Sequence, residues 1–326
     1  MIAPLDHRAM SDVVRHLRRR QHWGLVEIGF WLALVGVIVA FPARAALINE
    51  MLIAGLFALS LDLILGLTGV VSLGHAAFFG LGAYTAAIAA AAGWNDPLLG
   101  LLLAIPPAAL VGGLTAPLLL RGADLTRLMV TMGVSLMLGE LANKNEWLTG
   151  GADGLNFAVA PLFGHISLGS MGVGPRNAAL FSLVVLFVLF AFARRLRASP
   201  FGISLEGLRE NRLRAGALGV DTSRRIVAIY ALSAALAGVA GALSAETTQI
   251  VSLDLFEFHR SADVMLMLII GGAGWLYGGI VGAAIFIGVR DVVSAWTPEY
   301  WEFFIGLMLV VLVLSGRERL TARFRR

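Results

Sequence analysis

Cysteine is absent from this chain of 326 residues. Disulfides, thiolate metal sites and cysteine nucleophiles are therefore excluded. Charged residues are also scarce, at 14% of the sequence against 58% hydrophobic residues. Because soluble globular domains carry about 25% charged residues, this composition indicates a membrane protein.

Lysine is nearly absent as well, since Lys144 is the single lysine among 25 basic residues. A phosphate-binding P-loop requires a lysine in the pattern G-x-x-x-x-G-K-[ST], and Lys144 has no such glycines before it. The chain therefore lacks this route to nucleotide hydrolysis. It also lacks H-x-x-x-H, G-x-S-x-G and clustered carboxylates, which argues against a membrane enzyme. We expect no catalytic residue, no bound metal and no cofactor of its own.

Long apolar runs make up most of what is present. A helix of about 20 mostly apolar residues crosses a bilayer, and about ten runs approach that length. They lie at 25–41, 49–67, a glycine-rich tract ending near 93, 98–120, a run ending at 143, 178–193, 226–245, 264–293 (read as two spans) and 301–314. We expect an all-α polytopic membrane protein with a transmembrane domain at 25–315, a basic segment at 1–24 and a basic tail at 316–326.

The basic residues predict the orientation of these spans. Most of them fall in the N-terminal segment, the break at 121–127, the loop at 194–225 and the C-terminal tail. An even number of spans puts these four places on one side, which the positive-inside rule makes the cytoplasm. The loop at 144–177 then faces the opposite side. Because the arginines flank apolar spans, they indicate topology rather than nucleic-acid binding, and the first span is expected to be retained rather than removed as a leader.

The loop at 194–225 contains a predicted helix at 204–218, where leucines alternate with charges and Gly219 provides a C-terminal stop. A charged helix held between membrane spans has two plausible uses. It can solvate a loop, or it can dock onto a soluble partner that drives the membrane part. The residues themselves leave both uses open.

The tract at 66–84 combines five glycines with polar side chains. Irregular backbone at membrane depth is tolerated only where protein or a water-filled cavity satisfies it, and interrupted helices hold anionic groups in several transporters. We therefore expect this tract to line a translocation path, through Ser72, Gly74, His75, Phe78, Phe79, Gly82 and Tyr84. In the alternative, Ser72 caps a helix and His75 packs against a neighbour.

Small residues at four-residue spacing predict close helix packing, because lipid provides no hydrophobic drive between helices. One such ridge is Ala234, Gly238 and Ala242, and a second is Gly274, Gly278 and Gly282. Glycine pairs at 271–272 and 278–279 also interrupt the run at 264–293 and predict a tight reversal around 275–277. The second ridge spans this predicted reversal, so its three glycines cannot all lie on one helix. Either the ridge or the predicted position of the break must therefore be wrong.

Ionisable residues also lie inside or at the ends of apolar runs, namely Asp62, Glu140, Arg290 and Asp291. Such groups are candidates for function by default. Four scattered charges do not form a proton relay, so we expect packing or interface pairs. Adjacent helical residues point about 100° apart, and Arg290 is therefore expected to pair with another element rather than with Asp291.

Four segments of the sequence match a known set of family motifs and occur in the same order along the chain. They are S-L-G-H-A-A-F-F-G-L-G-A-Y-T at 72–85, L-T-G-G-A-D-G-L at 148–155, R-E-N-R-L-R-A-G-A-L-G-V-D at 209–221, and I-I-G-G-A-G-W-L-Y-G-G-I-V-G-A-A at 269–284. Together they resemble LivM-type permease subunits of bacterial branched-chain amino acid ABC importers, over most of 52–314. One departure is Gly216, where the family often has an acidic or amide residue.

The resemblance implies a type II ABC importer-like permease fold in the bacterial inner membrane. The implied partners are a second, LivH-type permease subunit, two cytoplasmic ATPase subunits that bind the ATP, a periplasmic substrate-binding protein and membrane lipid. ATPase coupling is assigned to Leu208, Glu210, Asn211, Arg214, Ala215, Ala217, Leu218 and Gly219. Docking of the binding protein is assigned to Asp153, Asp254 and Glu257, although the loop at 144–177 can equally be a plain connector.

The implied function is ATP-driven import of branched-chain or related amino acids. The family also transports urea and aromatic carboxylates, so these solutes stay open. A monosaccharide-type permease is the nearest rival, but it would lack the S-L-G-H-A segment. An ion-coupled secondary transporter would need coupling groups at mid-membrane and often an inverted repeat, and no convincing repeat is visible here.

Overall fold

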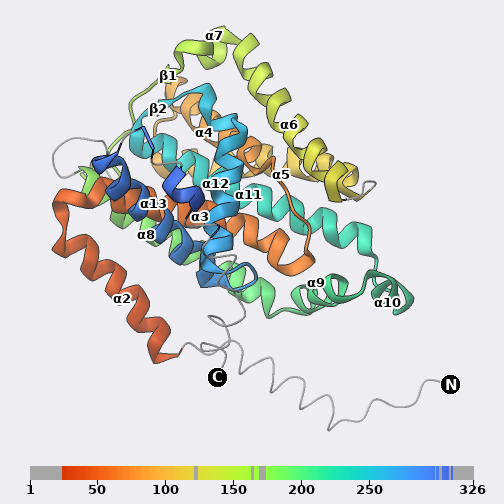
Figure 1. Ribbon diagram of the computed structural model, residues 1–326. Coiled ribbons are helices and arrows are strands. Elements are labelled where there is room, and N and C mark those ends of the chain that lie inside the picture. Colours follow the sequence, from red (N-terminus) through yellow and green to blue (C-terminus); the bar gives the residue numbers. More distant parts are fainter. Residues whose placement is uncertain are drawn as a thin grey trace.

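A computed structural model describes residues 24–120, 124–162, 165–168, 174–297, 299–300, 303–307 and 310. These residues form helices and one two-stranded sheet (Figure 1), which confirms the all-α class. In order the elements are α2 (Leu25–Ala40), η1 (Pro42–Arg44), α3 (Ala45–Thr68), α4 (His75–Ala91), α5 (Pro97–Leu120), α6 (Asp124–Lys144), α7 (Glu146–Thr149), η2 (Gly151–Asp153), β1 (Leu155–Asn156), α8 (Gly174–Arg197), α9 (Pro200–Glu210), α10 (Arg212–Ala217), α11 (Thr222–Thr248), β2 (Ile250–Val251), η3 (Leu253–Phe256), α12 (Phe258–Gly271) and α13 (Leu276–Trp296).

Six helices in the described part are long and apolar enough to cross a membrane. They are Pro42–Thr68, Pro97–Leu120, Leu125–Lys144, Gly174–Arg197, Thr222–Thr248 and Leu276–Trp296, and two shorter apolar helices are Leu25–Ala40 and His75–Ala91. This confirms a multi-pass membrane protein. The segments predicted at 1–24 and 316–326 lie outside the described residues, apart from Gly24, as does most of the span predicted at 301–314, of which 303–307 is helical.

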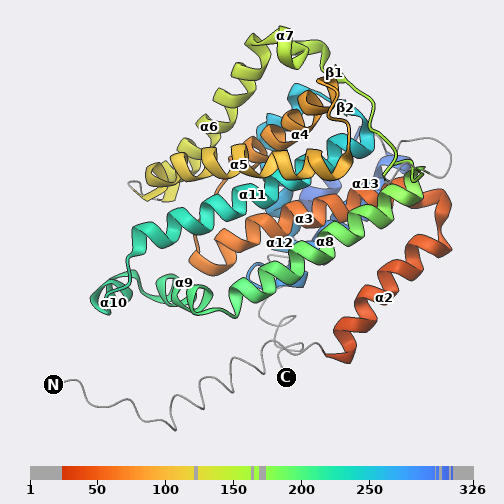
Figure 2. The same ribbon diagram turned by 180° about the vertical axis from the view of Figure 1, so that it is seen from behind.

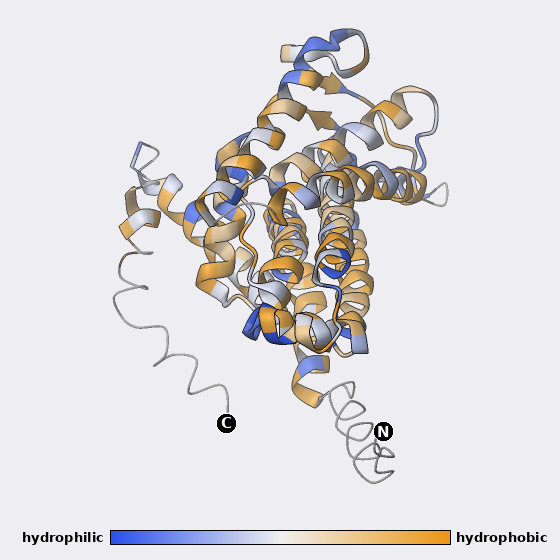
Figure 3. Cartoon of the chain, turned by 90° about the vertical axis from the view of Figure 1, so that its right-hand side faces the viewer, coloured by the Kyte–Doolittle hydropathy of each residue, from blue (hydrophilic) through white to orange (hydrophobic). Residues whose placement is uncertain are grey.

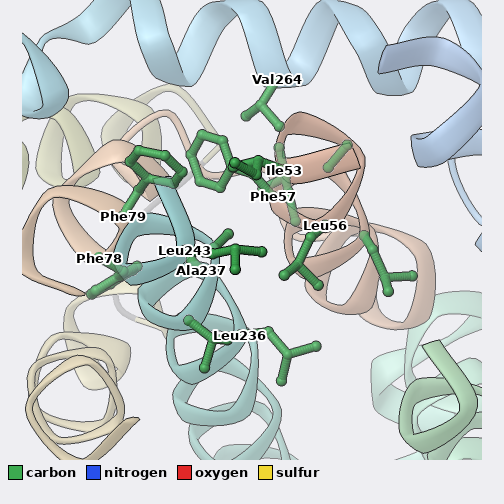
Figure 4. Close-up of a cluster of buried hydrophobic side chains, with 14 of the residues drawn as sticks. Ile53, Leu56, Phe57, Phe78, Phe79, Leu236, Ala237, Leu243 and Val264 are labelled. Atoms are coloured by element: carbon green, nitrogen blue, oxygen red, sulfur yellow. The ribbon is translucent and has the colours of Figure 1, made fainter. Parts of the chain in front are cut away.

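Two helices form the centre of the molecule. In the most apolar window of each span, 83% of residues are buried in Pro42–Thr68 and 78% in α11, against 28% in α5 and 17% in α6. Helix α3 packs against α13, α8 and α11, while α11 also packs against α5 and α4. Figure 4 shows side chains of α3, α4 and α11 meeting in this core, among them Leu56, Phe78 and Leu236. The faces of α5 and α6 that remain exposed are rich in leucine.

The ridge of Ala234, Gly238 and Ala242 is buried on α11. A Cβ on Gly82 of α4 would lie 2.0 Å from the carbonyl oxygen of Gly238, and one on Gly241 would lie 1.8 Å from that of Phe79. Helices α4 and α11 thus touch backbone to backbone, as small residues permit. Close packing at this ridge is confirmed.

The run at 264–293 does contain two helices, α12 and α13, with the reversal at 272–275. The expected break at 278–279 is wrong, because both glycines lie inside α13. A Cβ on Gly278 would lie 2.3 Å from the carbonyl oxygen of Gly272, and one on Gly282 would lie 1.9 Å from that of Met267. These glycines therefore let α13 cross α12 closely, whereas Gly274 lies in the turn with a positive φ of 82°.

The single helix predicted at 204–218 is wrong, because α9 and α10 are separate helices. Asn211 between them has extended backbone angles (φ −156°, ψ 104°), and its side-chain oxygen accepts a hydrogen bond from the Arg214 N–H at 2.9 Å. An asparagine that caps a new helix interrupts the old one. The leucine and charge pattern continues across this interruption and conceals it.

The loop predicted at 144–177 contains local secondary structure, and its choice between docking and plain connection stays a prediction. It contains α7, η2 and β1, and β1 pairs antiparallel with β2, so that Leu155 lies opposite Val251. The span predicted at 178–193 is also longer, since α8 starts at Gly174 and ends at Arg197. The strand pairing ties this loop to the segment between α11 and α12.

The molecule has two distinct ends. Helices α9 and α10 lie at one of them, and α7, β1 and β2 lie at the opposite one, in both Figure 1 and Figure 2. We call these the arginine end and the strand end. Figure 3 shows hydrophobic residues along the helices between them and hydrophilic stretches toward both ends, as expected of helices that cross a bilayer.

Candidate translocation and coupling sites

The helix break predicted in the glycine-rich tract lies between α3 and α4. Helix α3 ends at Thr68, Gly69 follows with φ of 73°, and α4 begins at His75. The Leu73 N–H donates to Thr131 Oγ1 at 3.1 Å, and the Ala76 N–H donates to Ser261 Oγ at 2.9 Å. Hydroxyl groups of α6 and α12 thus satisfy backbone groups that the irregular segment leaves free. Ser72 makes no cap hydrogen bond, since Gly74 is the N-cap residue of α4.

His75 is fully buried at this break. Its Nε2 lies 3.1 Å from Ser233 Oγ, and the Ser233 hydroxyl donates to the Ser60 carbonyl oxygen at 2.5 Å. A serine hydroxyl has one proton, so Ser233 accepts from His75 and the Nε2 atom carries the hydrogen. His75 Nδ1 has no hydrogen-bond partner among the described residues.

Aromatic rings surround the histidine. Phe57 of α3 stacks on His75 with ring centroids 6.0 Å apart, and Phe78 and Tyr230 present edges at 5.5 and 6.4 Å. Ser72 Oγ lies 3.4 Å from the Tyr230 hydroxyl. Three of the predicted path residues, Ser72, His75 and Phe78, therefore belong to one buried cluster between α3, α4 and α11.

The other four predicted path residues make different contacts, although Phe79 packs on Phe57 with ring centroids 4.7 Å apart. A Cβ on Gly74 would lie 1.9 Å from the Thr131 carbonyl oxygen, and Gly82 faces α11, so both are close-packing positions. Tyr84 stacks on Phe256 of η3 at 5.5 Å. Phe79 lines a cavity. The structure thus does not bring the seven residues together along one surface, and their role in translocation stays a prediction.

That cavity has a volume of about 490 Å³ and lies where α3, α8, α11, α12 and α13 meet near the strand end. Its charged lining residues are Glu50, Arg260, Asp263 and Arg290. Arg290 is hydrogen-bonded to Glu50, as expected for a residue that pairs with another element. Sequence reasoning missed the cavity as a site, although the polar residues at these span ends were a possible signal.

The residues predicted to couple to an ATPase divide into buried anchors and an exposed face. Leu208 and Ala215 are buried against the membrane helices. Glu210, Asn211, Arg214, Ala217, Leu218 and Gly219 are exposed. Leu213, which sequence reasoning did not select, is 89% exposed, and Leu218 is 79% exposed. Exposed leucines among charges at the arginine end form a surface suited to a soluble partner.

Two arginines connect this end to the membrane helices. Arg209 of α9 donates from Nη1 to the carbonyl oxygen of Gly66 in α3 at 2.7 Å. Arg197 donates to the carbonyl oxygen of Gly274 at 2.6 Å, and the Gly274 N–H donates to Asp62 Oδ1 at 2.6 Å. The packing role expected of Asp62 is thereby confirmed. No sequence pattern predicts these bonds, because their partners lie far apart along the chain.

The predicted docking residues lie at the strand end. Asp153 in η2 is exposed, and Glu257 contacts His259 Nδ1 at 3.0 Å. Asp254 accepts hydrogen bonds from the Ser252 hydroxyl and, at 3.0 Å, from Arg260 Nη2. Partial burial raises the pKa of Asp254, but these hydrogen bonds and the Arg260 charge outweigh it, so the pKa lies below its usual value.

Comparisons with known proteins add independent findings. The family model described as "Branched-chain amino acid transport system / permease component" matches residues 43–313. The chain is 29% identical over 317 residues to the high-affinity branched-chain amino acid transport system permease protein LivM of Salmonella typhimurium, covering 87% of this chain and 72% of the relative. Escherichia coli LivM matches with the same identity and coverage. Escherichia coli LivH is 23% identical over 272 residues, covering 79% and 87%. No solved structure matches.

Proposed function

This chain belongs to the family of branched-chain amino acid transport system permease components, and from that premise we propose that it moves branched-chain or related amino acids across a membrane as a subunit of an ABC importer. The observation that carries the proposal is the family match over 43–313. The six apolar helices long enough to cross a bilayer support a transmembrane role.

The proposed assembly pairs this chain with a second, LivH-type permease. Both LivM and LivH relatives resemble this chain. This likeness supports a pair of permeases from the same family that contact each other through similar surfaces. Two cytoplasmic ATPase subunits would bind and hydrolyse the ATP, and a periplasmic protein would deliver the amino acid. The exposed leucines at the arginine end suit the first contact, and the exposed carboxylates at the strand end suit the second.

The proposed orientation puts the arginine end in the cytoplasm and the strand end outside, in the bacterial inner membrane with about ten spans. The arginines concentrated in α8, α9, α10 and the start of α11 support it through the positive-inside rule. Both termini are expected in the cytoplasm. The position of α7, β1 and β2 at the opposite end agrees with a periplasmic docking surface.

The proposed mechanism begins when ATP closes the ATPase dimer against α10 and the exposed face of α9. Movement of α9 would be transmitted by Arg209 to the end of α3, through the hydrogen bond to Gly66. It would also pass from Glu206 of α9 to Arg197 of α8, and from there to the turn between α12 and α13 through the hydrogen bond to Gly274. The bond to Gly66 ends in the last turn of α3, just before the α3–α4 break, and the bond to Gly274 ends in the turn before α13. A rigid-body shift of packed helices would then alternate access.

Reconstitution tests this function. The chain is expressed with the permease, ATPase and binding-protein genes that neighbour it, and the purified complex is placed in liposomes with ATP inside. We expect ATP-dependent accumulation of labelled leucine when loaded binding protein is added outside, with competition by valine and isoleucine but not by urea or glucose. Uphill uptake by the isolated chain, without ATPase subunits, would instead support a secondary carrier.

A further inference from the structure

The cavity near the strand end has the dimensions of a small-molecule site. Its volume of about 490 Å³ lies within the range of roughly 300–1,000 Å³ that is typical of ligand pockets. It is formed by the first turns of α3, α8 and α12 and the last turns of α11 and α13. These five helices, which extend from α3 to α13 along the chain, contribute to one concave surface.

The lining changes from charged to apolar along three of these helices. Glu50 of α3 is followed one and two turns deeper by Ile53 and Phe57. Arg260 of α12 is followed in the same way by Val264 and Met267. Residues three, four and seven positions apart share one helical face, so each helix presents a charge at the strand end and apolar side chains deeper in the molecule.

Helix α13 runs in the opposite direction and repeats the pattern, with Arg290 at the strand end and Ile287 one turn deeper. Phe79 of α4 completes the apolar wall. Figure 4 shows Ile53, Phe57, Phe79 and Val264 gathered from three helices. The lining therefore suits an amphiphilic small molecule. Its polar end would contact the charged residues at the mouth, and its apolar end would contact the apolar side chains deeper in the cavity.

The charges at the mouth are balanced. Two guanidinium groups, from Arg260 and Arg290, stand beside two carboxylates, from Glu50 and Asp263. Arg290 is paired with Glu50, and Arg260 is paired with Asp254. A molecule that carries both charges can share these pairs without leaving either sign in excess, whereas an anion or a cation adds an unbalanced charge. Guanidinium groups bind carboxylates with directed, charge-assisted hydrogen bonds, and carboxylates accept from ammonium groups.

We propose that this cavity binds the transported solute as a zwitterionic amino acid with an apolar side chain. The ligand carboxylate meets the guanidinium groups, its ammonium meets Glu50 and Asp263, and its side chain packs on Phe57, Phe79 and Met267. This inference rests on the proposed function. It also gives the predicted docking residue Asp254 a second role, because its carboxylate is hydrogen-bonded to Arg260 at the mouth.

Binding to the purified full-length chain tests the site. Equilibrium dialysis measures labelled L-leucine against wild type, Arg290→Gln, which removes one guanidinium, and Ala54→Phe, which fills the cavity without touching an ion pair. Arg176→Gln is the matched control, since this exposed arginine lies outside the lining. Loss of a charge-assisted hydrogen bond predicts about tenfold weaker binding or more. We expect this loss in both cavity variants and unchanged binding in the control.

Three competitors separate the parts of the ligand. 4-Methylpentanoic acid lacks the ammonium group, isoamylamine lacks the carboxylate, and glycine lacks the side chain. Each is expected to compete about tenfold less well than leucine or worse. Absence of saturable leucine binding by the wild-type chain, or equal binding by wild type and both monodisperse cavity variants, overturns the proposal.

The same variants in the reconstituted complex separate this inference from the proposed function. If wild-type complex accumulates leucine and Ala54→Phe complex does so equally well, the cavity is not the site, although the transport function stands. If wild-type complex shows no ATP-driven uptake of any branched-chain amino acid, the transport function itself is rejected. Loss of uptake by Ala54→Phe and Arg290→Gln, with uptake retained by Arg176→Gln, supports both.

Discussion

At the scale of single residues, the contact between Gly82 and Gly238 sets the distance between α4 and α11. Gly82→Ala adds a Cβ that would lie 2.0 Å from the Gly238 carbonyl oxygen, which is closer than van der Waals contact allows. The helices must separate, and overpacking of this kind costs about 1–3 kcal/mol. Thermal unfolding of the purified chain in detergent should show a lower midpoint.

Gly133→Ala is the matched control for this prediction. Gly133 also lies inside a helix, α6, but a Cβ there would have no atom of the described residues within 4 Å. Alanine has the higher helix propensity, by about 1 kcal/mol. The midpoint of this variant should stay unchanged or rise, and an equal fall in both variants would contradict the close contact.

Asp254 gives a prediction for pH. Its pKa lies below the usual value because of Ser252 and Arg260, so the carboxylate is charged at neutral pH and its pair with Arg260 is intact. The stabilisation from that pair is present above the unfolded-state pKa and is lost as pH falls through the lowered one.

Arg260→Gln should raise the pKa of Asp254. Carboxyl-carbon NMR titration of aspartate-labelled chain measures it, and an unmoved titration would contradict the pairing.

At the scale of elements, the Arg209 side chain is hydrogen-bonded across the contact between α9 and α3. Arg209→Gln removes the guanidinium that donates to the Gly66 carbonyl oxygen at 2.7 Å. Because this hydrogen bond joins α9 to α3, we expect uptake to fall about tenfold or more, which corresponds to a loss of roughly 1.4 kcal/mol of coupling. The variant leaves the exposed charges of Glu210 and Arg214 in place, so ATPase subunits should still co-purify. Arg44→Gln at the strand end should transport normally. Normal uptake by Arg209→Gln would exclude this route of transmission.

Helix α10 and the end of α9 form the face itself. Glu210→Lys and Arg214→Glu reverse exposed charges at the centre of that face. Like charges at an interface reduce association, so both variants should lose uptake while their abundance in the membrane stays at the wild-type level. Co-purification of the ATPase with immunoblotting of membranes measures the two quantities. Full uptake by both variants would end the assignment of this face to coupling.

At the scale of the whole molecule, the absence of cysteine allows a direct test of orientation. Trp147 near the strand end is 83% exposed, and Leu213 at the arginine end is 89% exposed. A membrane-impermeant maleimide applied to intact spheroplasts should label Trp147→Cys, whereas Leu213→Cys should react only after the membrane is opened. The reverse pattern would invert the proposed topology and, with it, both docking surfaces.

Much of the fold could be predicted from local pattern. Apolar runs identified the membrane helices, because crossing hydrocarbon requires a continuous apolar stretch. The break before His75 and the reversal before Leu276 were visible as glycine-rich interruptions. The small residues around Gly238 indicated a close crossing before its partner was known. The boundary at Asn211 was missed because the amphipathic pattern does not change across it.

The sequence by itself determined that this is an all-helical membrane protein of the permease family, since composition, apolar length and ordered motifs are local properties of the chain. Only the tertiary structure decided which helix ends meet. Residues from distant segments meet in the bond from Arg209 to Gly66, in the cluster around His75 and in the cavity lined by Glu50 and Arg290. Hydropathy specifies that a helix lies in the membrane, but packing alone selects its neighbours.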